Sequence, residues 1–194
     1  MVLASGSPRR RELLALLGRE FDVDPADVDE TVWPGEDVLE YVVRVAEAKA
    51  AVAVERHPGR LVVAADTTVE LDGLIFGKPV DADDAARMLR ALSGREHRVH
   101  THVVVALKGP TASWGSGMTV TSAVRLDALD DPTIDAYIAS REPFDKAGAY
   151  AMQGRAAVFV RAVHGSVSGI IGLPLAELRA LLAESDDWLL ALGS

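Results

Sequence analysis

The chain has 194 residues, of which 49% are hydrophobic and 5% aromatic, and its net charge is −9. This length and composition predict a globular protein with a substantial core, and we expect a single domain over residues 1–194. The negative charge argues against a nucleic acid polymer as partner, because such binding depends on many Lys and Arg contacts. The chain has no cysteine and no apolar stretch near the ~20 residues of a spanning helix, which predicts a cytoplasmic protein without a membrane partner.

The first ten residues predict a short strand that leads into the start of a helix. The strand covers residues 2–4, and an apolar helical pattern follows Pro8. Ser7 suits the N-cap, where its hydroxyl could accept a first-turn N–H, and Pro8 suits the first helical position. Arg9 and Arg10 then lie in the first turn, where the helix dipole favours anions. Two interpretations are open: a capped surface helix with solvated arginines, or a site for an external phosphate.

An acidic loop and a long helix follow a short strand predicted at residues 21–24. The loop carries three carboxylates, including Glu30, which could bind a divalent metal or could simply be solvated. The helix is predicted over residues 36–55, and Lys49 lies in the middle of its apolar stripe. A lysine in that position must either extend its ammonium to water or meet an anion inside the protein.

An uninterrupted apolar run over residues 61–65 predicts a strand buried on both faces. Asp66 follows directly, so we expect it at the carboxyl end of this strand, where open α/β sheets bind ligands. A turn cap is the alternative, and function is favoured because no helix follows at once. Asp72-Gly73 predicts a hairpin turn, and the extended tripeptide after it presents Lys78 in a fixed direction.

The second half of the chain predicts further helices and strands. We expect helices over residues 81–93 and 131–140 and from residue 175, and strands over 97–107, 112–126 and 156–163. His100 and His102 share one face of a strand. Exposed histidines are favoured there over a metal pair, because no third ligand is in sight. The segment 142–154 contains Lys146 and Gln153 and is typical of a polar loop held close to a ligand.

Several short motifs together resemble the Maf family of nucleoside triphosphate pyrophosphatases, from Leu3 to about Leu182. The resemblance implies an α/β fold with an elongated, two-lobed mixed sheet flanked by helices, a central cleft like that of inosine triphosphatases, and a homodimer. The matching stretches are Ala4-Ser5-Gly6-Ser7-Pro8-Arg9-Arg10, the helix with Lys49, Ala65-Asp66-Thr67, Gly77-Lys78-Pro79, Met88-Leu89-Arg90-Ala91-Leu92-Ser93-Gly94, Asp145-Lys146-Ala147-Gly148-Ala149-Tyr150, Gln153-Gly154 and Gly172-Leu173-Pro174-Leu175.

The family's activity implies hydrolysis of a nucleoside triphosphate between its α- and β-phosphates, with Mg²⁺ or Mn²⁺, to a monophosphate and pyrophosphate. Asp66 matches the acidic residue taken as the base that activates water, and Glu30 matches an acidic residue near the metal, which Asp66 is also expected to bind. Lys49 and Lys78 match cations that face the triphosphate and are expected to act in catalysis with Asp66. The residues expected to bind substrate are Ser5, Ser7, Arg9, Arg10, Thr67, Lys146 and Gln153.

The base preference implied by the resemblance rests on three positions. Arg9, Thr67 and Gln153 match the branch that prefers dTTP and UTP. The chain departs from the usual pattern near the expected base pocket, with Ala151-Met152 before Gln153 and Val167-Ser168 further on. House-cleaning of modified nucleotides is an alternative within the same enzyme class.

A hypothesis from another class is a nucleotide-binding regulator of septum formation and cell division with little turnover. Asp66 distinguishes the two hypotheses. A sensor needs cations around a triphosphate but has little use for a carboxylate beside it, whereas a hydrolase needs a base.

Overall fold

The computed structural model describes residues 1–192, and the chain divides into two compact units. Unit 1 comprises Met1–Asp66, Thr101–Val120 and the chain from Gly172 onward, and unit 2 comprises Thr67–His100 and Thr121–Ile171. The single domain over residues 1–194 stays a prediction.

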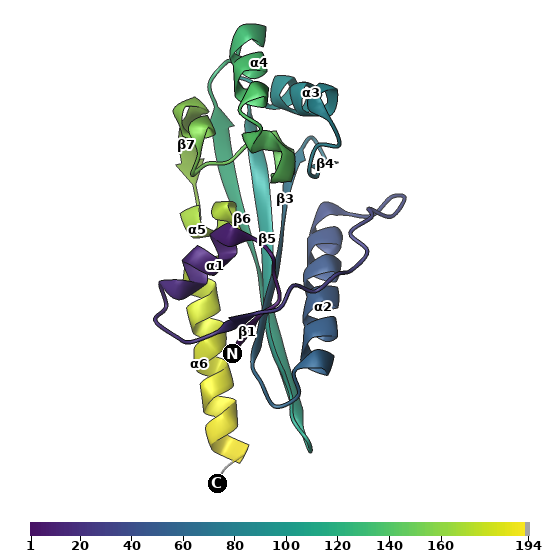
Figure 1. Ribbon diagram of the computed structural model, residues 1–194, viewed down its shortest axis with the longest axis vertical. Helices are drawn as coiled ribbons and strands as arrows, with labels where there is room; N and C mark the ends of the chain where they lie inside the picture. The colour runs from purple at the N-terminus through teal and green to yellow at the C-terminus, as the bar shows by residue number, and fades with distance from the viewer. Residues whose placement is uncertain (193–194) are drawn as a thin grey trace. The chain divides into compact units, whose positions relative to one another are not determined.

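The strands form a mixed sheet in the order β2-β1-β3-β5-β6-β7, with β4 beside β3. Strand β1 pairs in parallel with β2 and β3, whereas β4 and β7 pair antiparallel with β3 and β6. Helices flank the strands (Figure 1), so the predicted mixed α/β class is confirmed. The strands are β1 (Val2–Leu3), β2 (Asp22–Val23), β3 (Val62–Leu71), β4 (Leu74–Phe76), β5 (Glu96–Lys108), β6 (Ser113–Leu126) and β7 (Val160–His164).

Unit 1 contains α1 (Pro8–Ala15), α2 (Val38–Arg56) and α6 (Leu175–Leu192). Figure 1 draws α2 on one side of β1 and draws α1 and α6 on the other. Alanines of α2 pack against Val2 and Val62 in one apolar cluster, while Leu3 and Val63 are buried as well. Both faces of these parallel strands are therefore covered, which explains their uninterrupted apolar sequence.

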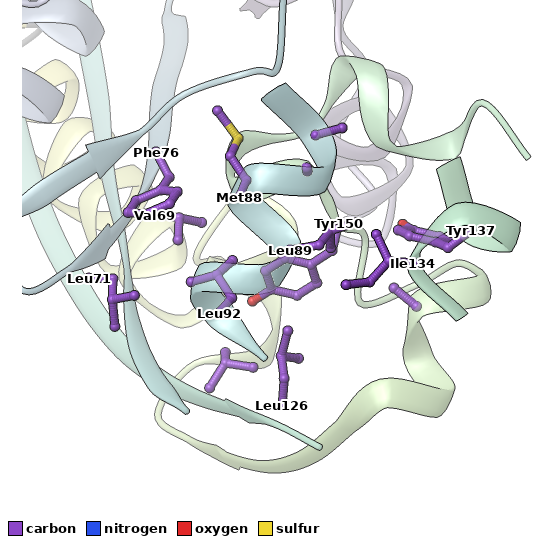
Figure 2. Close-up of a cluster of buried hydrophobic side chains, with 14 of the residues drawn as sticks. Val69, Leu71, Phe76, Met88, Leu89, Leu92, Leu126, Ile134, Tyr137 and Tyr150 are labelled. Carbon is purple, nitrogen blue, oxygen red and sulfur yellow. The ribbon is translucent and has the colours of Figure 1, made fainter. Parts of the chain in front are cut away.

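Unit 2 has its own apolar core (Figure 2), built from α3 (Ala82–Leu92), α4 (Asp131–Ala139) and the nearby strand segments. Leu89 and Leu92 of α3 lie in this core with Leu126 of β6 and Tyr137 of α4. The remaining elements are α5 (Val167–Ile171) and three 3₁₀ turns, η1 (Glu142–Asp145), η2 (Ala147–Ala149) and η3 (Arg155–Phe159).

The predicted hairpin between β3 and β4 is confirmed. Val69 pairs with Phe76, and Leu71 pairs with Leu74. The turn residues Asp72 and Gly73 have φ angles of 54° and 78°. Aspartate and glycine tolerate this left-handed geometry, which matches the twist of the two strands.

Three predictions about strands and membranes can be compared with the structure. Strand β3 continues from Val62 to Leu71, so the prediction that Asp66 stands at a strand end is wrong. The strand predicted over 156–163 is wrong in its first half, because residues 155–159 form a 3₁₀ turn before β7 begins at Val160. Within the described residues, no helix is long and apolar enough to span a membrane.

Candidate functional site

Lys49 lies at the centre of a charged cluster in unit 1. It is a buried residue of α2, and its Nζ donates a hydrogen bond to Oδ1 of Asp66 at 2.8 Å. The same ammonium lies 2.6 Å from Oε1 of Glu30. Only 8% of the Lys49 side chain and 10% of the Asp66 side chain are exposed, so the pair is screened weakly by solvent. Of the two outcomes left open for Lys49, the structure selects an ammonium that meets anions inside the protein.

The position of Asp66 inside β3 depends on this contact. A carboxylate in a buried strand is unfavourable unless it is paired. Because Lys49 supplies the partner, the extended backbone passes through Asp66 without a break. Asp66 and Thr67 are consecutive in the strand, so their side chains point to opposite faces of the sheet.

Tyr41 holds the acidic loop against α2. Its hydroxyl donates to the backbone oxygen of Glu30 at 3.1 Å, and Arg44 donates to the backbone oxygen of Thr31 at 2.9 Å. Burial and then the negative charges of Asp66 and Glu30 raise the pKa of Tyr41, so its hydroxyl stays protonated and able to donate. Sequence analysis did not identify Tyr41 as a site residue. The sequence signal that could have indicated a role for Tyr41 is its position eight residues before Lys49 on the buried face of the same helix.

Arg10 interacts electrostatically with Asp66 and Glu30 of this cluster, and two hydrogen bonds to other residues hold its guanidinium. Its Nε donates to the backbone oxygen of Gly172 at 2.8 Å, and its Nη1 donates to Oγ of Ser5 at 3.2 Å. Burial lowers the pKa of Arg10, while Asp66 and Glu30 raise it in part. A cation that has lost much of its water in this way favours an anion beside it. The contact with Gly172 was missed by sequence analysis, although its motif had been noted.

The start of α1 is arranged differently from the predicted cap. Ser7 does occupy the N-cap position, with extended φ and ψ angles of −70° and 119°, but its hydroxyl makes no capping hydrogen bond. Instead the Ser7 N–H donates to Oγ of Ser5 at 3.2 Å. The prediction of a Ser7 side-chain cap is therefore wrong. Ser5 organises this turn because its buried oxygen accepts from both Ser7 and Arg10.

Glu30 and Asp66 offer carboxylate oxygens that would fit a divalent cation. Both contact the same ammonium of Lys49, so the two carboxylates converge on one point. Among residues 1–192, no group of three or more His, Cys, Asp and Glu side chains is placed to hold a metal. Mg²⁺ is commonly bound by one or two carboxylates together with substrate phosphates. The pair thus fits a cation that shares its coordination with a nucleotide.

Unit 2 contains the other four predicted site residues. Lys78 is exposed in the tripeptide after β4, and Thr67 is half-buried in β3. The N–H of Gly148 donates to the backbone oxygen of Gly77 at 3.0 Å, which joins the Lys78 segment to the segment that follows Lys146. The ammonium of Lys146 pairs with the neighbouring Asp145.

Gln153 extends an exposed side chain from a tight turn in unit 2. The turn is closed by a hydrogen bond of 3.0 Å from the N–H of Gly154 to the backbone oxygen of Ala151. The Gln153 amide can both donate and accept hydrogen bonds.

His100 and His102 are buried, with 4% and 6% of their surface exposed, so the prediction of exposed histidines is wrong. Nδ1 of His100 lies 2.9 Å from Oγ1 of Thr121, and Nδ1 of His102 lies 2.7 Å from Oγ1 of Thr119. Gly117 makes room for His102, because a Cβ at that position would lie 2.6 Å from its Nε2. Inside the sheet, threonine partners therefore bond one nitrogen of each ring, and the sequence does not reveal this pairing because the partners lie 17 and 21 residues away.

Comparison with known proteins identifies several relatives. Residues 1–185 match the family model described as Maf-like protein. The dTTP/UTP pyrophosphatase of Anaeromyxobacter dehalogenans (strain 2CP-1) is 53% identical over 182 residues, which cover 94% of this chain and 92% of that protein. The dTTP/UTP pyrophosphatase of Chromobacterium violaceum is 51% identical over 187 residues, which cover 94% and 92%. The dTTP/UTP pyrophosphatase of Myxococcus xanthus is 49% identical over 182 residues, which cover 94% of this chain and 90% of that protein.

A solved structure also shows some similarity. The Ham1 protein of Staphylococcus aureus aligns with a TM-score of 0.41 and 17% sequence identity, covering 81% of this chain and 89% of that one. The match of the family model over residues 1–185, with relatives 49–53% identical over nearly their whole length, shows that the chain belongs to the Maf-like protein family.

Proposed function

We propose that this protein hydrolyses nucleoside triphosphates, dTTP and UTP foremost, between the α- and β-phosphates to a nucleoside monophosphate and pyrophosphate. Family membership and the activity named for its relatives support the reaction. The observation that carries the proposal is the buried Asp66 carboxylate, held by Lys49 in a cluster that also contains Arg10. This cluster combines a base with cations suited to phosphate.

Asp66 is proposed as the general base. One carboxylate oxygen is held by Lys49, which fixes the direction of the other. That oxygen would take a proton from the water that attacks the α-phosphorus, while the bond to the β-phosphate oxygen breaks and pyrophosphate leaves. Lys49 would keep the carboxylate correctly oriented.

The proposed cations offset the charge of the triphosphate, which carries about four negative charges, as more charge moves to the leaving group. In unit 1 these are Arg9, Arg10 and Lys49. The anchors from Gly172 and Ser5 set the orientation of the Arg10 guanidinium before substrate arrives, so little reorganisation is needed. Ser5 and Ser7 are proposed to border the same phosphates. Lys78 and Lys146 of unit 2 are proposed to serve the same substrate on the strength of the family motifs.

Glu30 and Asp66 are proposed to hold Mg²⁺ or Mn²⁺. When bound, the cation would neutralise phosphate charge during the transfer. The phosphate oxygens would then be further partners for the Lys49 ammonium beside Asp66.

Base selection is assigned to Thr67 and Gln153. Thymine and uracil present two carbonyl oxygens and one N–H, which the Gln153 amide can match with a donor and an acceptor. Modified pyrimidine nucleotides with the same hydrogen-bonding edge remain in the proposed substrate class. A homodimer and a cytoplasmic location are proposed from the family resemblance and, for the location, from the absence of cysteine in the sequence.

The alternative, a nucleotide-binding regulator of septum formation with little turnover, is not favoured. A regulator has no need of Asp66, because a buried carboxylate beside a triphosphate opposes binding. In this protein the carboxylate is buried and paired with Lys49.

The experiment that tests the proposal is a panel of five nucleotides, dTTP, UTP, CTP, ATP and GTP, with Mg²⁺ or Mn²⁺. Pyrophosphate and orthophosphate are measured separately, with Asp66→Asn enzyme as the control for contaminating phosphatases. We expect pyrophosphate with dTTP and UTP ahead of the others by roughly tenfold or more in kcat/KM. Orthophosphate and a nucleoside diphosphate as products would overturn the proposed reaction.

A further inference from the structure

The carboxylate of Glu142 forms a hydrogen-bonded anchor for the turn that carries Gln153. Its Oε2 accepts from the N–H of Arg155 at 3.0 Å, and its Oε1 accepts from the N–H of Ala156 at 3.4 Å. The hydroxyl of Tyr137 donates to Oε1 of Glu142 at 2.9 Å. The same hydroxyl accepts from the N–H of Ala151 at 3.2 Å. Glu142 and Tyr137 thus hold the backbone on both sides of Gln153.

Gly154 allows the Glu142 carboxylate to lie close to the backbone of this turn. A Cβ at residue 154 would lie 2.2 Å from Oε1 and 2.6 Å from Oε2 of Glu142, distances that no side chain can occupy. The glycine that follows Gln153 is therefore explained by the carboxylate behind it. No property of Gly154 in the sequence alone indicates this partner, which lies twelve residues earlier.

The anchor is charged and rests on a rigid support. Burial raises the pKa of Glu142, but hydrogen bonds from Arg155, Tyr137 and Ala156 and the charge of Lys146 together outweigh burial, so the net pKa is lowered. The carboxylate is therefore ionised at neutral pH and makes charge-assisted hydrogen bonds to backbone N–H groups. Tyr137 is 3% exposed in the core of unit 2 (Figure 2). Its ring packs edge-on against Phe159, with ring centroids 5.4 Å apart.

We propose that Glu142 and Tyr137 are positioning residues for base selection, because they fix the turn from which Gln153 reads the base. This inference rests on the proposed function of Gln153. A hydrogen-bonding residue discriminates between bases only if its own position is fixed, since a loose amide adapts to the wrong base as readily as to the right one. Tyr137 and Glu142 supply that rigidity, because they accept hydrogen bonds from the backbone N–H groups of residues 151, 155 and 156.

A purely structural role is the alternative, in which Glu142 caps the η3 turn and only contributes stability. The two roles predict different effects of an anchor substitution on base preference when Gln153 is absent. A structural cap alters stability regardless of residue 153. A positioning residue alters base preference only while Gln153 is present.

The experiment is a double-mutant cycle read out as the ratio of kcat/KM for dTTP to that for CTP. Glu142→Gln and Tyr137→Phe are each made in the wild-type chain and in a Gln153→Ala chain. Asp130→Asn is the matched control, since Asp130 also accepts from a backbone N–H, that of Thr133 at 3.0 Å, but at the start of α4.

We expect Glu142→Gln to lower the dTTP-to-CTP ratio by roughly tenfold, mainly through a higher KM for dTTP. Tyr137→Phe should lower it by roughly threefold, because one hydrogen bond to the turn is lost. In the Gln153→Ala chain neither change should lower the ratio further. Asp130→Asn should leave the ratio unchanged while lowering the thermal midpoint.

Three results would overturn the inference: an unchanged ratio in both anchor variants, an equal fall in the Gln153→Ala chain, or a fall with Asp130→Asn. Hydrogen exchange checks that the anchor variants fold. Exchange should rise in peptides covering residues 151–156 and stay at the wild-type level in peptides from the rest of the chain. The proposed function is tested separately with the wild-type enzyme. It fails if that enzyme does not prefer dTTP and UTP over the other nucleotides, or if it forms no pyrophosphate.

Discussion

The Lys49 ammonium lies 2.8 Å from Oδ1 of Asp66 and at the same time 2.6 Å from Oε1 of Glu30. The two carboxylates proposed to bind a divalent cation thus share one lysine as their counter-ion. A cation that enters between them must compete with an ammonium already there. Substrate phosphates would relieve this competition, because they give Lys49 another anion to contact.

The first prediction concerns metal binding without nucleotide. Glu30 and Asp66 lose their internal counter-ion in the Lys49→Gln variant, so we expect its affinity for Mn²⁺ to rise by about tenfold or more. Mn²⁺ binding is measured at pH 8 by electron paramagnetic resonance or calorimetry on the protein alone. The matched control is Lys108→Gln, which removes an exposed lysine paired with Glu55. Equal Mn²⁺ affinity in Lys49→Gln and wild type would contradict the shared counter-ion.

The second prediction concerns Asp66. Asp66→Asn keeps the shape of the side chain but removes the base, so kcat should fall by about 10²–10⁴-fold. Binding of a non-hydrolysable dTTP analogue in the absence of metal, measured by calorimetry, should be retained or tightened because a negative charge is gone. Asp37→Asn is the control, since Asp37 caps α2 by accepting from the N–H of Leu39. Turnover of Asp66→Asn within about threefold of wild type would exclude it as the base.

The third prediction concerns Gln153. Gln153→Ala removes the donor and acceptor proposed to pair with thymine or uracil, and an unpaired buried group costs about 1–3 kcal/mol. The preference for dTTP and UTP over CTP, ATP and GTP should therefore narrow, mainly through KM. Steady-state kinetics on all five nucleotides measure this. A variant that keeps the full preference of the wild type would remove Gln153 from base recognition.

The fourth prediction concerns pH and stability. His97 is 2% exposed and shares a hydrogen bond of 2.7 Å with the Tyr150 hydroxyl, and burial lowers its pKa to about 4 although Glu70 opposes the shift. The unfolded chain binds a proton at this histidine near pH 6.5. Between pH 6.5 and 4 the unfolded state therefore holds more protons, so stability falls as the pH falls through this window.

The expected loss from His97 between pH 7 and pH 5 is about 2 kcal/mol in the free energy of unfolding. Urea unfolding at the two pH values measures it. His97→Gln should reduce this pH dependence, whereas His164→Gln, at an exposed position, should not. Burial lowers the pKa of His102 in the same direction, so part of the dependence should persist in His97→Gln. An unchanged pH dependence in His97→Gln would contradict the assignment.

Local patterns in the sequence were sufficient to predict most elements. The helix predicted over 36–55 is observed at Val38–Arg56, and the hairpin at Asp72-Gly73 is observed as predicted. Apolar periodicity and turn chemistry act over a few residues, so the sequence displays them directly. Lys49 was recognised for the same reason, as a charge in the middle of an apolar helix face.

Contacts between residues distant in sequence could not be predicted in the same way. Asp66 was expected to end its strand, because the buried lysine that permits a carboxylate inside β3 lies 17 residues earlier. Gly172 contacts Arg10 across 162 residues, and Glu142 contacts the turn after Gln153 through backbone N–H groups that no side-chain pattern reveals. Tertiary partners decide these positions, and local propensity does not.

The most direct test of the proposed reaction is a single turnover of dTTP in water enriched in ¹⁸O. If the attacking water is activated at Asp66 and strikes the α-phosphorus, one ¹⁸O atom should appear in dTMP and none in pyrophosphate. Mass spectrometry of the separated products locates the label. Label in pyrophosphate would mean attack on the β-phosphorus, and label in orthophosphate with dTDP would mean attack on the γ-phosphorus. Either of these two results would contradict the proposed mechanism.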